Sequence, residues 1–283
     1  MGAAGLVEIK RRLKSVQSTK KITNAMGLVA TSKLRKCRRE LRGNDEYVKV
    51  AEDTIKSICS NIDEDYSIPY FDGNRSEKKL YIVITSDSGL CAGYNNNVIS
   101  YLSNLVKDNK ENSIVIAVGN KGVSAIKRLG LQTIAEFVDI PDVPTITEVR
   151  TIYESALDAF LKEEVSEVNV VYTHFISPIK QEVKVEKLLP ISSVDKEETQ
   201  QLIEPDLESV LRESLDIYIK GTLRNLMLSS KCSEQSSRKS AMDSATSTAN
   251  DIIDDLNIKY NRIRQAAITN EISEIVSGAE TQK

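Results

Sequence analysis

The distribution of proline limits what this chain can fold into more than any other feature of its sequence. All six prolines lie between residues 69 and 205, so neither end of the chain contains one. Between residues 206 and 277 the only glycine is Gly221. A proline inside a helix costs about 3 kcal/mol or more, and a glycine costs about 1 kcal/mol. Both ends are therefore expected to form long, uninterrupted helices.

Apolar residues recur along both ends mostly in steps of three and four or their sums, which is the spacing of a coiled-coil seam. In the first stretch they are Leu6, Ile9, Leu13, Val16, Ile22, Met26, Val29, Cys37, Leu41, Val48, Ile55, Ile58 and Ile62. In the second they are Leu207, Leu211, Leu215, Tyr218, Met242, Ala245, Ala249, Ile252, Leu256, Ile263 and Ala267. One helix leads into the middle of the chain and the other leaves it, so we expect antiparallel pairing.

A run of small and polar residues at 229–250 interrupts the second seam. In isolation this Ser- and Thr-rich run would form a poor helix, and a disordered linker is the alternative interpretation. The apolar pattern resumes at Ile252, which favours a continuous helix. Small residues in such a helix would let its partner approach closely.

The middle of the chain alternates strand and helix patterns. Strands are expected within 78–89 and at 113–118, 168–175 and 182–189, with helices at 94–106, 121–129 and 149–161. This alternation is typical of a mostly parallel sheet covered by helices. The predicted fold is therefore α/β plus a long antiparallel coiled coil. Its expected parts are an N-terminal helix (1–65), a Rossmann-like α/β domain (75–195) and a C-terminal helix (206–283).

The first 42 residues carry twelve Lys and Arg against two Glu, a local charge of +10 in a chain of net charge −3. Such a stripe suits nucleic acid, anionic lipid or an acidic protein surface. The first aromatic residue is Tyr47, so the stripe has no side chains for stacking on bases. A docking surface for acidic proteins and a solvated helix face remain the two main interpretations.

The four cysteines lie far apart and include no CxxC pair, which argues against a metal site or a disulfide framework and fits a reducing compartment. We find no signal-peptide pattern and no apolar run near the roughly 18 residues of a membrane span. The chain is therefore expected to be soluble and not exported.

The segment SDSGLCAGYN at 86–95 follows a predicted strand and opens a helix, where α/β sheets usually bind ligands. It matches neither GxGxxG nor GxxxxGK[ST]. We interpret it as a tight turn in which Gly89 and Gly93 supply positive φ angles, with a small-ligand site as the alternative.

The only histidine, His174, lies in an apolar strand with no second histidine to share a metal, so a structural role is expected. The sequence shows no nucleophile–base constellation. We therefore expect no catalytic residue, no cofactor and no metal ion in this chain.

Three separated segments, in order, resemble the gamma subunit of the rotary F-type ATP synthase, of bacterial type. They are the opening helix EIKRRLKSVQSTKKITNAMGLVATSKLRK (8–36), the turn at 86–95, and the closing run at 241–279. Ser88 stands where the family commonly has a basic residue, and Ala92 stands where it has a glycine.

The resemblance implies a non-catalytic central-stalk rotor subunit. In that family the paired helices form a shaft within a ring of three alpha and three beta subunits. The α/β domain contacts the epsilon subunit and the membrane rotor ring, at the cytoplasmic face of the cell membrane. Ion flow turns the shaft, and ATP is made or hydrolysed on the partner subunits. No nucleic acid, cofactor or membrane span of its own is implied.

The resemblance also implies residues that contact the ring. Met26 matches a position near the torque contact, and Lys33 and Arg35 lie on the same basic helix. Arg238, Gln265 and Thr269 match polar positions of the closing helix that take part in ring contact and coupling. The competing hypotheses are a coiled-coil α/β nucleotide-binding enzyme and a nucleic-acid-binding coiled coil.

Overall fold

The computed structural model describes residues 2–59, 69–191 and 203–280. The contacts divide the chain into two units. The sheet unit comprises residues 31–238, and the helix-pair unit comprises residues 1–30 and 239–283. The two long helices are confirmed: α1 is Gly2–Cys59 and α6 is Leu207–Glu280. The run at 229–250 is helical throughout, so the linker interpretation is wrong. The three-part domain division stays a prediction.

In the described residues of the sheet unit, five strands form one sheet in the order β3-β2-β1-β4-β5. They are β1 (Lys79–Ile84), β2 (Ser113–Val118), β3 (Gln132–Phe137), β4 (Glu167–Phe175) and β5 (Gln181–Leu189). The pairs β1–β2, β2–β3 and β1–β4 are parallel, and β4–β5 is antiparallel. The mostly parallel sheet is therefore confirmed. Sequence patterns missed β3, an edge strand without a fully buried residue.

The described part of the chain also forms four shorter helices: α2 (Pro69–Asp72), α3 (Tyr94–Leu105), α4 (Asn120–Leu129) and α5 (Ile146–Leu161). The start of α5 shows how local sequence sets a boundary. Thr145 is its N-cap and forms a capping box with Glu148, which satisfies amide groups that a helix start leaves without partners. The helices α3, α4 and α5 were predicted from sequence patterns, whereas the single turn of α2 was not.

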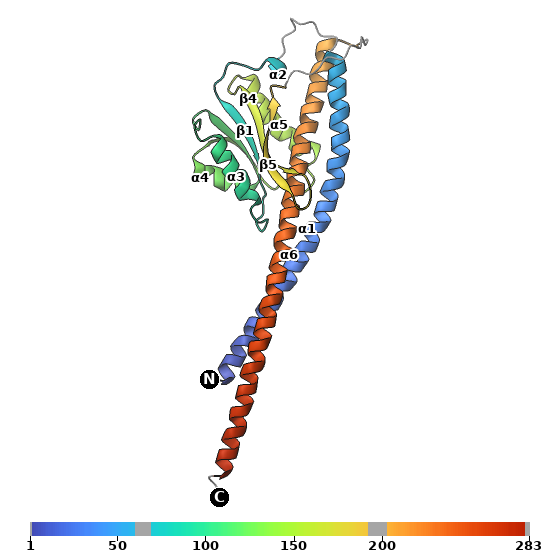
Figure 1. The fold of residues 1–283 in the computed structure, drawn as a ribbon. Helices are drawn as coiled ribbons and strands as arrows, with labels where there is room; N and C mark the ends of the chain where they lie inside the picture. The colour runs from blue at the N-terminus through green and yellow to red at the C-terminus, as the bar shows by residue number, and fades with distance from the viewer. Residues whose placement is uncertain (1, 60–68, 192–202, 281–283) are drawn as a thin grey trace. The chain divides into compact units, whose positions relative to one another are not determined.

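Helices cover both faces of the sheet (Figure 1). Successive side chains of a strand point to opposite faces, and β1 is buried on both of them after Lys79. Leu80, Ile82 and Ile84 pack in one core with α5, α6 and the end of α1. Tyr81 and Val83 pack in a second core with α3 and α4.

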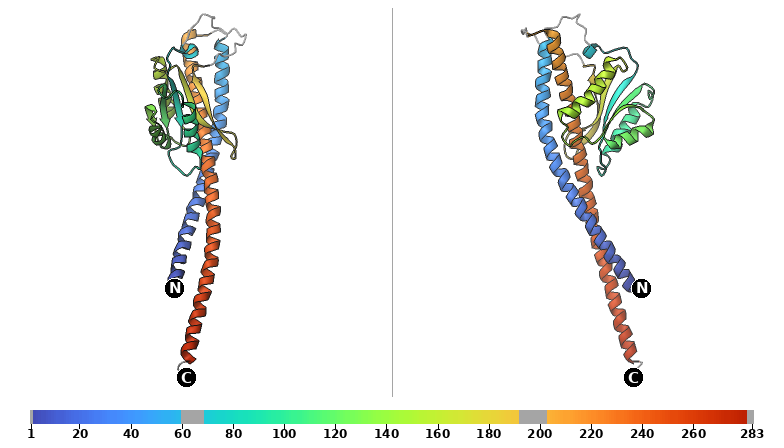
Figure 2. Two further views of the ribbon diagram at one scale, coloured as in Figure 1. Left: turned by 60° about the vertical axis from the view of Figure 1, so that its left-hand side comes forward. Right: turned by 180° about the vertical axis from the view of Figure 1, so that it is seen from behind.

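Within the sheet unit α1 and α6 run antiparallel and lie side by side (Figure 2). The side-chain amide of Asn44 donates to the carbonyl oxygen of Gly221 at 2.9 Å. Closer to the N-terminus of α1, Cys37 shares a cluster with Cys232. Residues closer to the N-terminus of α1 therefore contact residues closer to the C-terminus of α6, as antiparallel pairing requires. A Cβ atom at Gly221 would lie 3.0 Å from the ring of Tyr47, so glycine permits this close approach.

Within the helix-pair unit the two helices are also antiparallel. The hydroxyls of Thr23 and Thr246 lie 2.7 Å apart, and the ammonium of Lys10 lies 5.6 Å from the ring centroid of Tyr260. A Cβ atom at Gly27 would lie 3.2 Å from the carboxylate of Asp243. Small and hydroxyl side chains thus form much of this contact.

The residues that form the seam differ in part from those predicted. Ile22 and Val29 are exposed, at 60 % and 54 %, whereas Thr23, Gly27 and Ala30 are buried. The prediction failed because apolar spacing alone assigned the seam, while close helix packing favours small side chains whether or not they are apolar. On α6, Ile252 is likewise 37 % exposed.

Candidate functional site

The candidate site is the carboxyl edge of the parallel strands, which we call the crevice. It is bordered by the turn 85–93 after β1, Gly119 after β2 and the loop 138–144 after β3. Open α/β sheets bind their ligands at this edge. Here α6 lies against it, and residues 226–236 of that helix are buried without interruption.

Serine side chains of α6 form hydrogen bonds with the backbone of β4 beyond the point where its pairing with β1 ends. The register of β1 with β4 stops at Val83 and Val171. Beyond that point the amide of Phe175 donates to Ser229 Oγ at 2.9 Å, and Ser233 Oγ donates to the carbonyl oxygen of Thr173 at 3.1 Å. Buried backbone groups need such partners. At these two positions α6 therefore supplies the hydrogen-bond partners that a neighbouring strand would otherwise supply.

Ser230 ties the same helix to α3. Its hydroxyl lies 2.7 Å from the hydroxyl of Tyr94, and both side chains are buried. Burial, followed by the charge of Glu234, raises the pKa of Tyr94 well above its ordinary value. The tyrosine is therefore neutral at physiological pH and remains available as a donor.

The start of α4 is occupied by a carboxylate of the chain itself. Asp87 Oδ1 accepts from the amide of Asn120, the first residue of α4, at 3.1 Å and from the amide of Asp139 at 2.9 Å. A helix N-terminus beside a sheet is a common place for a phosphate group. In this crevice Asp87 fills that place.

A buried ionic cluster links α6 to the turn 85–93 of the crevice. Lys231 Nζ lies 3.5 Å from Glu234 Oε2 and 3.9 Å from Asp87 Oδ2. Arg238 NH1 bonds to Glu234 Oε1 at 2.7 Å, and its NH2 bonds to Ser88 Oγ at 3.0 Å. Because buried charges are costly unless they are paired, this cluster requires α6 and the turn 85–93 to keep their places.

The turn 86–93 has a different backbone from the one expected. Positive φ angles occur at Leu90 (62°) and Ala92 (49°), whereas Gly89 and Gly93 are not among the described residues with positive φ. The expectation that these two glycines supply it was therefore wrong. Ala92 adopts the left-handed conformation although it has a side chain.

Of the six residues predicted to contact a ring, five lie at least partly at the surface and Arg238 is buried. Met26 is partly buried, and Arg35, Gln265 and Thr269 are exposed. Lys33 is exposed but forms an ion pair of 2.9 Å with Asp142 of its own chain.

The remaining member, Arg238, is 7 % exposed and bonds within the chain, as described above. Contact of these six residues with a partner stays a prediction. His174 packs edge-on against Tyr172 with ring centroids 6.1 Å apart.

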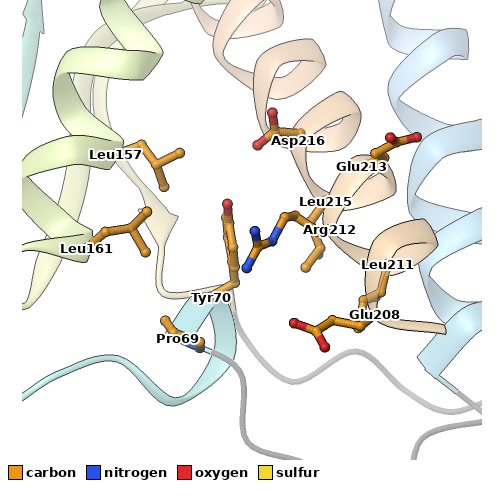
Figure 3. A pocket seen from close by; sticks show the side chains of 10 residues that line it. All are labelled: Pro69, Tyr70, Leu157, Leu161, Glu208, Leu211, Arg212, Glu213, Leu215 and Asp216. Atoms are coloured by element: carbon orange, nitrogen blue, oxygen red, sulfur yellow. The ribbon is translucent and has the colours of Figure 1, made fainter. Parts of the chain in front are cut away.

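A pocket of about 440 Å³ opens elsewhere in the sheet unit and was not found from sequence (Figure 3). It is lined by Pro69, Tyr70, Leu157, Leu161, Glu208, Leu211, Arg212, Glu213, Leu215 and Asp216. The hydroxyl of Tyr153 donates to Asp216 Oδ1 at 2.5 Å. Burial, and next this hydrogen bond, raise the pKa of Tyr153. A neutral tyrosine therefore holds the carboxylate at the pocket wall.

Within 2–59, 69–191 and 203–280, no group of three or more His, Cys, Asp or Glu side chains is arranged to hold a metal ion. Across the same ranges, no helix has the length and apolar character to cross a membrane.

The family to which this fold belongs is identified by sequence. The model of the ATP synthase family matches residues 5–281. The chain is 58 % identical over 283 residues to the ATP synthase gamma chain of Clostridium botulinum (strain Eklund 17B / Type B), and 53 % identical over 282 residues to that of Clostridium beijerinckii. Each alignment covers 100 % of both chains. The chain belongs to the family of ATP synthase gamma chains.

Solved structures share the fold. A chain of the Euglena gracilis mitochondrial ATP synthase has a TM-score of 0.72 at 15 % identity, covering 99 % of this chain and 95 % of that one. A chain from the central stalk and c-ring of the Tetrahymena thermophila mitochondrial ATP synthase has a TM-score of 0.62 at 24 % identity, covering 79 % and 99 %. At these identities the likeness concerns the fold.

Proposed function

We propose that this chain is the central-stalk rotor subunit of an F-type ATP synthase, coupling ion flow through a membrane ring to ATP synthesis or hydrolysis on partner subunits. The observation that carries the proposal is the position of α6 in the crevice. The helix that pairs with α1 also bonds to β4, α3 and two loops of the sheet unit. Within the sheet unit, α6 is thus fixed to the sheet at several separate points, as a helix that drives the sheet would need to be.

The same observation supports a role without catalysis of its own. The crevice, where an α/β enzyme would hold its substrate, contains Ser229, Ser230 and Arg238 of α6 and the carboxylate of Asp87. In our proposal the chemistry of ATP takes place entirely on the catalytic subunits, and this chain contributes movement.

The proposed partners are three alpha and three beta subunits, the epsilon subunit and the membrane rotor ring, at the cytoplasmic face of the cell membrane. The basic stripe of α1 supports contact with acidic protein loops, since complementary charge steers and orients such contacts. The proposed contact residues are Met26, Lys33, Arg35, Arg238, Gln265 and Thr269. Many modest, solvent-screened contacts suit a surface that must slide.

The test is to purify the native complex through an affinity tag on this chain. We expect alpha, beta and epsilon subunits in the eluate, with one copy of this chain for three catalytic subunits, and ATP hydrolysis by the complex. The tagged chain purified alone should hydrolyse no ATP. Turnover by the isolated chain, or a complex without the catalytic subunits, would overturn the proposal.

A further inference from the structure

Two cysteines from opposite ends of the chain lie together inside the sheet unit. Cys37 of α1 and Cys232 of α6 are both 0 % exposed and share a cluster with Leu34. The side chains of the two cysteines are hydrogen-bonded to each other. Cys37 Sγ in turn donates to the carbonyl oxygen of Asp142 at 3.0 Å. One sulfur is therefore directed at the other.

The remaining cysteines have other surroundings. Cys91 Sγ accepts from the side-chain amide of Asn95 at 3.2 Å and lies 3.7 Å from Ser86 Oγ. Cys59 packs in the large core beneath the sheet. Cys37 and Cys232 thus differ from ordinary buried cysteines, which behave as small apolar groups. A disulfide requires close and correctly directed side chains, which a hydrogen-bonded pair of thiols on adjacent helices provides.

We propose that Cys37 and Cys232 form a redox pair that a peroxide converts to a disulfide joining α1 to α6. Cys37 gives up its thiol proton, its sulfur attacks one peroxide oxygen, and the O–O bond breaks. The leaving hydroxide takes up that proton to form a water molecule, and a sulfenic acid remains on Cys37. The Cys232 sulfur then attacks the sulfenic sulfur and loses its proton, and the S–O bond breaks to release a second water molecule. Two thiols are oxidised by two electrons, and one peroxide is reduced to two water molecules.

The hydrogen bond assigns the two roles. It lowers the pKa of Cys37, against burial, which raises it. The same bond, followed by burial, raises the pKa of Cys232. The thiolate is the attacking form of cysteine, so Cys37 is the nucleophile and Cys232 is the resolving thiol.

The path of the oxidant runs through the loop 138–144. Asp142, whose carbonyl oxygen accepts from Cys37, also carries a carboxylate that is 32 % exposed and pairs with Lys33. The Cys37 thiol therefore lies directly beneath a surface ion pair. In this proposal, hydrogen peroxide reaches Cys37 when the loop is locally displaced.

The experiment uses the purified full-length chain, treated with hydrogen peroxide and then digested without reduction. Mass spectrometry should find one peptide pair linked through Cys37 and Cys232, and dithiothreitol should separate it. The disulfide closes a loop that contains the whole sheet. It should therefore raise the midpoint of thermal unfolding by about 5–15 °C. Cys37→Ser and Cys232→Ser should each abolish the link and the shift, while Cys59→Ser and Cys91→Ser should retain both.

The peptide map of the unaltered chain decides the question even if a cysteine variant misfolds. The proposal fails if circular dichroism shows a folded chain while the two cysteines remain unlinked or proceed separately to sulfinic and sulfonic acids. It also fails if Cys59 or Cys91 enters disulfides as readily as this pair, or if the link forms only in urea. None of these outcomes bears on the rotor proposal.

Discussion

At the scale of single residues, Gly119 has less room for a side chain than Gly89 or Gly93, the other two glycines that border the crevice. Its φ angle is +93°, and a Cβ atom there would lie 2.4 Å from the carbonyl oxygen of Thr85. We expect Gly119→Ala to destabilise the chain by about 1–3 kcal/mol or more, because backbone strain and a backbone clash act together. Urea unfolding measures the change.

Gly89→Ala is the matched control for this substitution. A Cβ atom at Gly89 meets Lys121 at 3.8 Å, an ordinary contact with a flexible side chain. Its free energy of unfolding should stay within about 0.5 kcal/mol of the parent. Similar losses at Gly89 and Gly119 would contradict this account of the crevice.

The raised pKa of Tyr94 should make the free energy of unfolding depend on pH in the alkaline range. Its pKa in the folded chain is raised, so the folded state holds the proton more tightly than the unfolded chain does. Stability from this group is complete below about pH 10 and is lost as pH rises from there toward the folded pKa. We expect Tyr94→Phe to weaken the fall in unfolding free energy between pH 9 and 11. An unchanged slope would exclude Tyr94 as a source of the effect.

The basic residues Lys33 and Arg35 should respond differently to charge reversal. Lys33 has an internal partner in Asp142, so Lys33→Glu places two carboxylates together and should lower the stability of the isolated chain slightly. We expect Arg35→Glu to leave stability unchanged and to reduce ATP-driven ion pumping per ATP hydrolysed in the assembled complex. Lys49→Glu, at another exposed position of α1, is the control and should keep the parent ratio. Normal coupling by Arg35→Glu would make Arg35 a solvated surface residue.

At the scale of elements, the contact between α6 and β4 is the most informative. Ser229→Ala removes the acceptor of the Phe175 amide, and an unsatisfied buried donor costs about 1–3 kcal/mol. We expect that loss in urea unfolding, together with faster hydrogen exchange at the Phe175 amide. The exposed Ser240→Ala on the same helix should change neither quantity. If exchange at Phe175 were unaltered, α6 would not be acting as a strand partner.

At the scale of the molecule, the small residues of α6 allow the two long helices to pack closely and keep the helix pair narrow. Ala249 is buried and Ala245 is partly buried in the helix-pair unit. Replacing both with Leu should overpack the seam at a cost of about 1–3 kcal/mol, which long paired helices absorb. Helicity by circular dichroism should persist, while ion pumping by the assembled complex should fall.

Replacing the same two alanines with serine is the control, because it adds one atom at each position and should leave pumping intact. If the Leu pair pumped normally, the idea that these helices must stay narrow would be wrong, whatever their helicity.

The sequence by itself determined the long terminal helices and most of the α/β order. Both are properties of the local chain: a stretch without proline stays helical, and strand and helix periods show in a few neighbouring residues. The tertiary structure decided the rest. It placed Thr23 in the seam and left Ile22 outside, and it gave positive φ to Ala92 rather than Gly93.

The serines of α6 show why the site itself could not be predicted. Ser229 and Ser233 look like weak helix formers in the sequence, yet they complete the hydrogen bonding of a strand more than fifty positions away. The periodicity of neighbouring residues does not show which distant backbone groups lack a hydrogen-bond partner. Those partners exist only once the sheet and α6 are packed together, so the crevice is a property of the fold.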